Sequence, residues 1–175
     1  MKKTLLLIII GIFANCDFKV KSGKIANNNF RNNVIESQNK FPKKNGFVSD
    51  FENIFTSEQL SIFEKTINEY ENKFGREIYV ITTANTYGFE NYEQLMNAFF
   101  QNWNVGKLPE KNGVIILLSK ENRKFAITAG LNAQKFLTDK KLNEVIGINV
   151  IPKLKENNFY SGTKSAVEEI IKLWK

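Results

Sequence analysis

The stretch GVIILLSKENRKFAIT, residues 113–128, decides the architecture of this chain. Its first six residues, Gly113–Leu118, form a continuous apolar run, which is typical of a strand covered on both faces. The polar turn Lys120-Glu121-Asn122 follows, and a second strand is expected over 124–128. Because a parallel neighbour needs a crossover of a dozen or more residues, a turn this short predicts two antiparallel neighbouring strands.

Upstream of this hairpin, strands and helices alternate. The β-branched and aromatic run over 77–83 predicts another strand with both faces covered. A helix is expected before it, because Thr56 and Gln59 have the spacing of a capping box and Gly75 follows the last apolar position. A second helix is expected from its cap Asn91 toward residue 103.

The flanking segments complete the order of elements. An extended entry is expected over 47–50, and Thr138 caps a helix after the hairpin. Pro152 is expected to kink or restart that helix, and Ser161 to open the last one. The predicted order β, α, β, α, β, β, α, α favours an α/β sandwich with a mixed sheet of about four strands.

The N-terminal segment has the pattern of an export leader. Lys2 and Lys3 precede an apolar run over 5–13, and the small residue Ala14 and the polar Asn15 follow. This is the pattern of a secretory signal peptide, and the apolar run is about half the roughly 20 residues that a spanning helix requires. Residues 1–15 are therefore predicted to be a leader that is removed.

Cys16, which is the one cysteine of the chain, directly follows this leader. The run Phe13-Ala14-Asn15-Cys16 resembles a bacterial lipobox, in which the cysteine receives the lipid and becomes the mature N-terminus. We therefore expect an envelope lipoprotein, anchored through Cys16 and facing the periplasm or the exterior. The alternative is an ordinary signal peptide cut nearby, with Cys16 an incidental thiol.

The positive charge of the chain is concentrated next to the anchor. Residues 16–46 carry seven basic and two acidic residues, a net charge of +5, whereas residues 47–175 carry 16 of each. The asparagine- and lysine-rich composition of residues 16–46 predicts a disordered basic tether, and a folded domain is expected over 47–175. The tether is either attracted to anionic lipid headgroups or simply solvated. The neutral domain does not favour a nucleic-acid partner.

Several kinds of catalytic chemistry are excluded by composition. The chain has no histidine, which excludes Ser-His-Asp triads, Cys-His pairs and imidazole metal ligands. A single cysteine provides neither a zinc finger nor a redox dithiol. The Asp50-Phe51-Glu52 segment has Glu where an Asp-x-Asp phosphatase needs its second Asp, and we interpret this near match as chance.

Oxygen ligands are the chemistry that remains. Asp50 follows the entry strand, and Asp139 follows the helix cap at Thr138. Together with Asn112 and backbone carbonyls, they could bind Ca²⁺ or Mg²⁺ weakly. Asp139 alternatively serves only the helix dipole. Arg123, after the turn, is either an anion-binding residue or a solvated hairpin residue.

Eight segments of the chain, in this order and spacing, resemble the TPM domain family. They are Val48-Ser49-Asp50, Trp103-Asn104-Val105-Gly106, Asn112–Leu117, Asn122-Arg123-Lys124, Gly130-Leu131, Leu137-Thr138-Asp139, Ile151-Pro152 and Phe159-Tyr160-Ser161-Gly162.

The resemblance covers about residues 47–174 and implies a three-layer α/β/α sandwich. The family includes a plant thylakoid-lumen protein and many bacterial envelope proteins, which often carry an N-terminal signal or anchor. The family pattern Gly-x-Gly-Leu-Glu reads Thr128-Ala129-Gly130-Leu131-Asn132 here. Asn132 stands where the family pattern has Glu, and this replacement weakens any metal or phosphatase role that the resemblance implies.

Two functions remain open at this point. The favoured hypothesis is a membrane-tethered, non-catalytic accessory that binds or helps to assemble a membrane protein complex, its protein partner unidentified. The alternative, implied by the family's phosphatase label, is a metal-dependent acid phosphatase acting on phosphoesters, with Asp50, Asp139 and Arg123 in its site.

Overall fold

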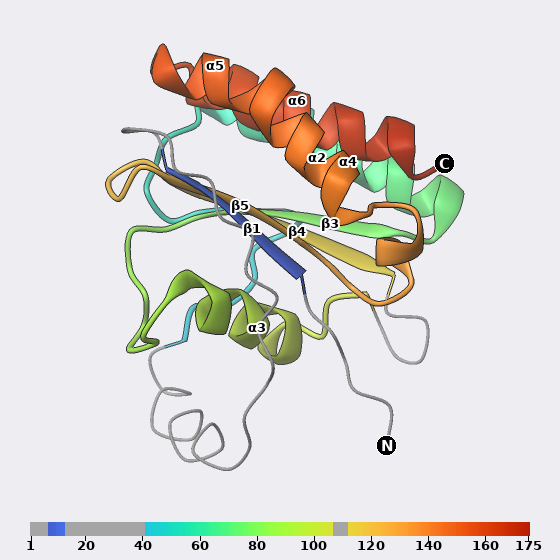
Figure 1. Ribbon diagram of the computed structural model, residues 1–175, viewed down its shortest axis with the longest axis horizontal. Coiled ribbons are helices and arrows are strands. Elements are labelled where there is room, and N and C mark those ends of the chain that lie inside the picture. Colours follow the sequence, from blue (N-terminus) through green and yellow to red (C-terminus); the bar gives the residue numbers. More distant parts are fainter. Residues whose placement is uncertain (1–6, 13–40, 107–111) are drawn as a thin grey trace.

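A computed structural model describes residues 7–12, 41–106 and 112–175 of the chain. Figure 1 shows a central sheet with helices on both faces, which confirms the predicted α/β/α class. The strands are β1 (Leu7–Ile12), β2 (Val48–Asp50), β3 (Glu77–Thr82), β4 (Gly113–Ser119) and β5 (Lys124–Ala129). The helices are α2 (Ser57–Phe74), α3 (Tyr92–Asn102), α4 (Asp139–Glu144), α5 (Ile151–Lys155) and α6 (Phe159–Leu173), with a short 3₁₀ turn η1 (Ala133–Lys135) and a π-helix η2 (Val145–Val150).

The sheet is mixed, with the strand order β1-β5-β4-β3-β2. Strands β2, β3 and β4 are parallel, and β4 and β5 form the antiparallel hairpin predicted from residues 113–128. Four strands therefore come from the predicted domain. The fifth, β1, pairs antiparallel with β5 and comes from the apolar run predicted to be part of a leader. Cleavage after Asn15 would remove this edge strand and leave the other four.

The two crossover helices lie on opposite faces of the sheet. Helix α2 packs with α4–α6 over one core, which contains Ile78, Val80 and Ile116, whereas α3 covers Tyr79, Ile81 and Ile115 on the other face. Both crossovers step across the sheet in the same direction, from β2 to β3 to β4. Because they pass on opposite faces, they have opposite hands, although right-handed crossovers are the strong norm.

The helix boundaries follow their capping residues. Thr56 and Gln59 form the predicted capping box of α2, which ends at Gly75 with φ +64°. Helix α6 begins two residues earlier than predicted, because Asn158 is its cap and accepts a hydrogen bond from the Ser161 amide at 3.1 Å. Pro152 lies in the first turn of α5, directly after the π-helix, so it restarts the helix as expected.

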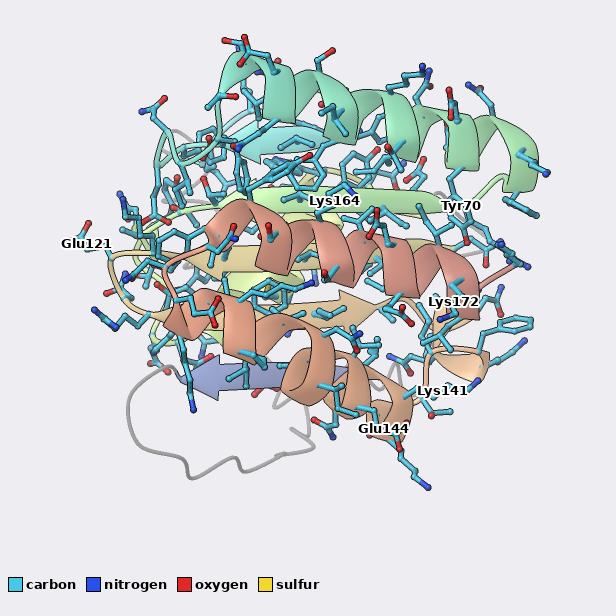
Figure 2. All side chains as sticks on the ribbon, turned by 90° about the horizontal axis from the view of Figure 1, so that it is seen from above. Tyr70, Glu121, Lys141, Glu144, Lys164 and Lys172 are labelled. Carbon is cyan, nitrogen blue, oxygen red and sulfur yellow. The ribbon has the colours of Figure 1, made fainter. Side chains whose placement is uncertain are left out.

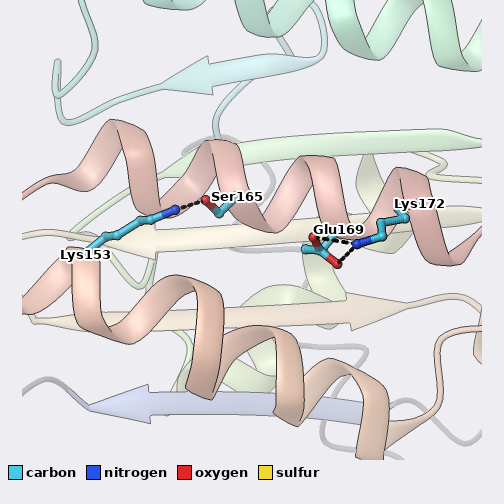
Figure 3. A network of polar contacts seen from close by, with 4 residues as sticks. All are labelled: Lys153, Ser165, Glu169 and Lys172. Atoms are coloured by element: carbon cyan, nitrogen blue, oxygen red, sulfur yellow. Dashed lines mark hydrogen bonds and ion pairs between the residues drawn. The ribbon is translucent and has the colours of Figure 1, made fainter.

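Seen from above, α2, α6 and the α4–α5 segment lie side by side across one face of the sheet (Figure 2). Polar side chains of this outer layer contact one another. Lys153 of α5 donates a hydrogen bond to Ser165 of α6, and Lys172 pairs with Glu169 on the surface of α6 at 3.3 Å (Figure 3). The first contact joins two neighbouring helices of this layer.

The domain begins before the predicted boundary at residue 47. Phe41 packs against the rings of Tyr87, Phe89 and Phe99. The indole N–H of Trp103 donates to the Pro42 carbonyl at 3.0 Å. Residues 41–46, which the composition assigned to the tether, are therefore docked on the α3 side of the domain. The rest of the predicted tether, and Cys16 itself, lie outside the described residues.

Candidate functional site

An open crevice of about 750 Å³ lies at the carboxyl ends of the parallel strands. Phe51 and Glu52, which follow β2, form one side, and Thr83 to Asn85 with Tyr87, which follow β3, form another. Lys120, Glu121 and Arg123 of the β4–β5 turn complete the rim. Three separate connections therefore converge on one opening.

The topology explains why an opening forms here. The chain leaves β2 toward α2 on one face of the sheet and leaves β3 toward α3 on the other (Figure 1). Two adjacent parallel strands whose connections diverge to opposite faces leave a crevice outside their carboxyl ends. In open α/β sheets, this is the place where ligands bind.

Asp50, predicted as a cation ligand, lies at the end of β2 beside this crevice. One carboxylate oxygen accepts a hydrogen bond from the Phe55 amide at 2.8 Å, and the other accepts from the Thr82 hydroxyl. The same hydroxyl oxygen accepts from the Glu52 amide at 3.1 Å. Asp50 thus holds the loop that leads to α2 against the end of β3.

Glu52 makes the matching connection to the hairpin. Its two carboxylate oxygens accept hydrogen bonds from the amides of Glu121 at 3.0 Å and Lys120 at 3.2 Å. Asn122 donates from its side chain to the Ala84 carbonyl at 2.9 Å, so the loop after β3 is joined to the same turn. The carboxylates of Asp50 and Glu52 therefore both accept hydrogen bonds from backbone or hydroxyl donors. The side chain of Glu121, by contrast, points outward from the hairpin tip (Figure 2).

Strained backbone positions gather around the crevice. Tyr87 and Arg123, each with φ near +50°, both line it, and Asn53 has φ +51° in the loop after β2. A bulky residue in the left-handed region costs about 1–3 kcal/mol and often marks a functional or clamped segment. Arg123, predicted as an anion-binding residue, therefore lies where such a role is possible. Its guanidinium makes no hydrogen bond or ion pair with the part of the chain that the structure describes.

The structure does not bring the three predicted cation ligands together. Asp50 pairs with Thr82 and lies at the carboxyl end of the parallel strands, whereas Asn112 precedes β4 at the opposite end. The five residue steps from Gly113 to Leu118 separate these ends by about 17 Å. Asp139 lies on the Asn112 side, because β5 returns the chain to that end before α4 begins. A single cation cannot contact oxygens at both ends.

At that opposite end, the two remaining residues have local roles. The Asn112 carbonyl accepts from the Glu77 amide at 2.9 Å, and its amide donates to Gly106 at 3.0 Å. Asp139 is the first residue of α4, one carboxylate oxygen is buried without a hydrogen bond, and burial raises the pKa of this carboxyl. Across residues 7–12, 41–106 and 112–175, no group of three or more acidic, cysteine or histidine side chains is arranged to hold a metal.

The sequence patterns predicted only part of the crevice. They identify neither Lys120 nor Tyr87 as a site residue, and Glu52 only as a chance near match to a phosphatase motif. Their shared signal is position, since each lies within a few residues of the end of a predicted strand. Reading the residues that follow all three parallel strands together would have found them.

Comparison with known protein families identifies the chain. A family model described as the TPM domain matches residues 48–173. The chain belongs to the TPM domain family. This TPM domain therefore covers the sheet from β2 to β5 with helices α2 to α6, while β1 lies outside the match.

Solved structures of bacterial proteins share the fold. The N-terminal domain of a protein from P. gingivalis is 18% identical with a TM-score of 0.63, over 73% of this chain and 80% of that one. The N-terminal domain of the cg2496 protein from Corynebacterium glutamicum is 16% identical (TM-score 0.57; 78% and 85% covered). The BA42 protein from the psychrophilic bacterium Bizionia argentinensis is 20% identical (TM-score 0.56; 71% and 88% covered). At these identities the likeness concerns the fold. Comparison with curated proteins gave no match.

Proposed function

We propose that this TPM domain is a membrane-tethered binding module of the bacterial envelope, held through a lipid on Cys16, which binds or helps to assemble a membrane protein complex without catalysis. The leader pattern, the lipobox-like run ending at Cys16 and the basic composition of residues 16–40 support the tether. No helix among the described residues is long and apolar enough to cross a membrane.

One observation carries the non-catalytic part of the proposal. Both acids nearest the strand ends, Asp50 and Glu52, use both carboxylate oxygens to join the loops of the crevice to one another. A nucleophile or a metal ligand needs an oxygen that points at the substrate or the cation. Here the carboxylates point at the protein's own amides and a hydroxyl, so they act as structural links around a recognition crevice.

The experiment compares anchoring and catalysis in the same preparation. Wild-type protein should sediment with membranes, whereas the Cys16→Ser variant should be released. Neither should hydrolyse p-nitrophenyl phosphate with Mg²⁺ or Ca²⁺ between about pH 4, near the ordinary pKa of carboxyl groups, and about pH 8. A Cys16→Ser variant that stays as membrane-bound as wild type contradicts the tether.

A metal-dependent phosphatase acting on phosphoesters is the second candidate. The observation that favours it is Arg123, which lines the crevice together with Lys120 and has no acceptor among the residues that the structure describes. Two cations can stabilise a phosphoryl group. Hydrolysis that survives purification and is lost in both Arg123→Ala and Asp50→Asn, with the fold retained, would replace the binding-module proposal by this one.

A further inference from the structure

Within the part of the chain that the structure describes, strand β1 alone covers the outer edge of β5. All six residues of β5 pair with β1, from Leu7 opposite Ala129 to Ile12 opposite Lys124. Strand β1 lies at the rim of the sheet, with helix α4 alongside it (Figure 1). The same six residues form the centre of the predicted leader. Removal of residues 1–15 would therefore uncover the whole edge of β5.

Beyond its first residue, that uncovered edge lacks the usual protection. Natural edge strands carry charges, prolines or bulges that prevent pairing with another chain. From Phe125 to Ala129 this strand has no charged residue and no proline, and every one of these residues is buried in the structure. Lys124 is the one charge, at its first position. Unpaired backbone N–H and C=O groups along such a strand favour the addition of a further strand.

The geometry selects one extended segment rather than a second copy of the domain. Helix α4 packs against the strand that occupies this edge, in the layer above the sheet. An added strand needs only about 4.8 Å beside β5, whereas helices require about 8–10 Å between their axes. A second domain would bring its own α4 into the space that α4 already fills.

We propose that the edge of β5, beside α4, is an acceptor groove for an extended apolar segment of a membrane protein partner. The chain's own Leu-Ile-Ile-Ile-Gly-Ile segment, residues 7–12, shows what fits. It is uncharged, rich in β-branched residues, and runs antiparallel to β5. Before processing, the leader fills the groove, and after processing the partner segment takes its place. This inference rests on the proposed tethering, since it requires the leader to be removed.

Amide hydrogen exchange along β5 tests the groove. The protein purified from membranes is compared with the unprocessed full chain made by cell-free synthesis. A synthetic peptide of residues 2–13 is the probe, with Lys2 and Lys3 for solubility, and the same peptide with Ile9→Pro is the control, because proline cannot pair across a sheet. In the processed protein the outward-facing β5 amides should exchange fast. The probe should slow them about tenfold when present at about ten times its Kd, and the proline peptide should not.

Two outcomes overturn the groove. One is exchange in the processed protein that the probe does not slow. The other is a β5 edge already as protected after processing as before, which would mean that another segment, such as the tether, has filled it. The intact mass of the purified protein reports on tethering separately. A chain that retains Met1 contradicts the tether, whereas a processed chain without probe protection contradicts only the groove.

Discussion

The two ends of the parallel strands differ in how their polar groups are used. At the amino end, the buried Glu77 accepts a hydrogen bond from the Gly106 amide at 2.7 Å, and the backbone there is closely packed. At the carboxyl end, the loops after β2, β3 and β4 surround an open crevice. Strand β4 runs from the amino end to the carboxyl end, so the same sheet has one closed, structural end and one open end. The room for a ligand is at the open carboxyl end.

The largest expected effect tests the closed end. A Cβ on Gly106, where φ is +80°, would lie 2.5 Å from the Gly113 nitrogen. Gly106→Ala should cost about 3 kcal/mol or more in the free energy of unfolding, since it adds a backbone clash to the left-handed strain. Urea unfolding measures this cost.

Gly88→Ala is the matched control, in the loop that leads from the crevice to α3. Its φ is +85°, but a Cβ there would have nothing within 4 Å. Only the conformational strain remains, so we expect a loss of about 1 kcal/mol. Equal losses in the two variants would show that the amino end is not more tightly packed than the loop, and the comparison would fail.

An intermediate effect is expected for Asp50 at the open end. Asp50→Ala removes the acceptor for the Phe55 amide and the Thr82 hydroxyl, and should cost about 2 kcal/mol. Asp50→Asn keeps one acceptor oxygen and should cost about 1 kcal/mol or less. Thermal and urea unfolding measure both. If neither variant loses stability, Asp50 is not a structural link, and its carboxylate is available for a ligand.

Local patterns predicted most of the fold because they depend on neighbouring residues. The capping box of Thr56 and Gln59, the stop at Gly75 and the antiparallel hairpin around Lys120-Glu121-Asn122 all lie within a few residues of the feature they determine. The docking of Phe41 was not predictable in this way, because its ring partners are up to 58 positions away and its surrounding composition is polar. The composition of a polar segment does not reveal that one of its residues, here Phe41, packs on the domain.

The candidate site was harder to predict for the same reason. Asp50 and Arg123 were identified, and both lie at the crevice or beside it. Asn112 and Asp139 were grouped with Asp50 by residue type alone, while the strand order places them at the other end of the sheet. Which end of a sheet a residue occupies depends on the direction of each strand, and the choice of faces by α2 and α3 created the crevice. Neither the strand directions nor the faces that the helices cover can be predicted from a single segment of the sequence.

The smallest expected effect is the pH dependence contributed by Asp139 at the closed end. Burial raises the pKa of this carboxyl above its ordinary value in the folded protein. The unfolded chain therefore releases this proton at a lower pH than the folded one. Stability from this group is highest when it is protonated in both states, and falls as the pH rises through the unfolded pKa toward the folded pKa.

Asp139→Asn removes the charge and should raise the stability at neutral pH relative to wild type, by about 0.5 kcal/mol or less. It should change little at a pH below both values. Thermal unfolding of the two proteins at neutral and at acidic pH provides the measurement. A variant that is less stable than wild type at neutral pH, with the difference vanishing in acid, would mean that the ionised carboxylate stabilises the start of α4 through the helix dipole.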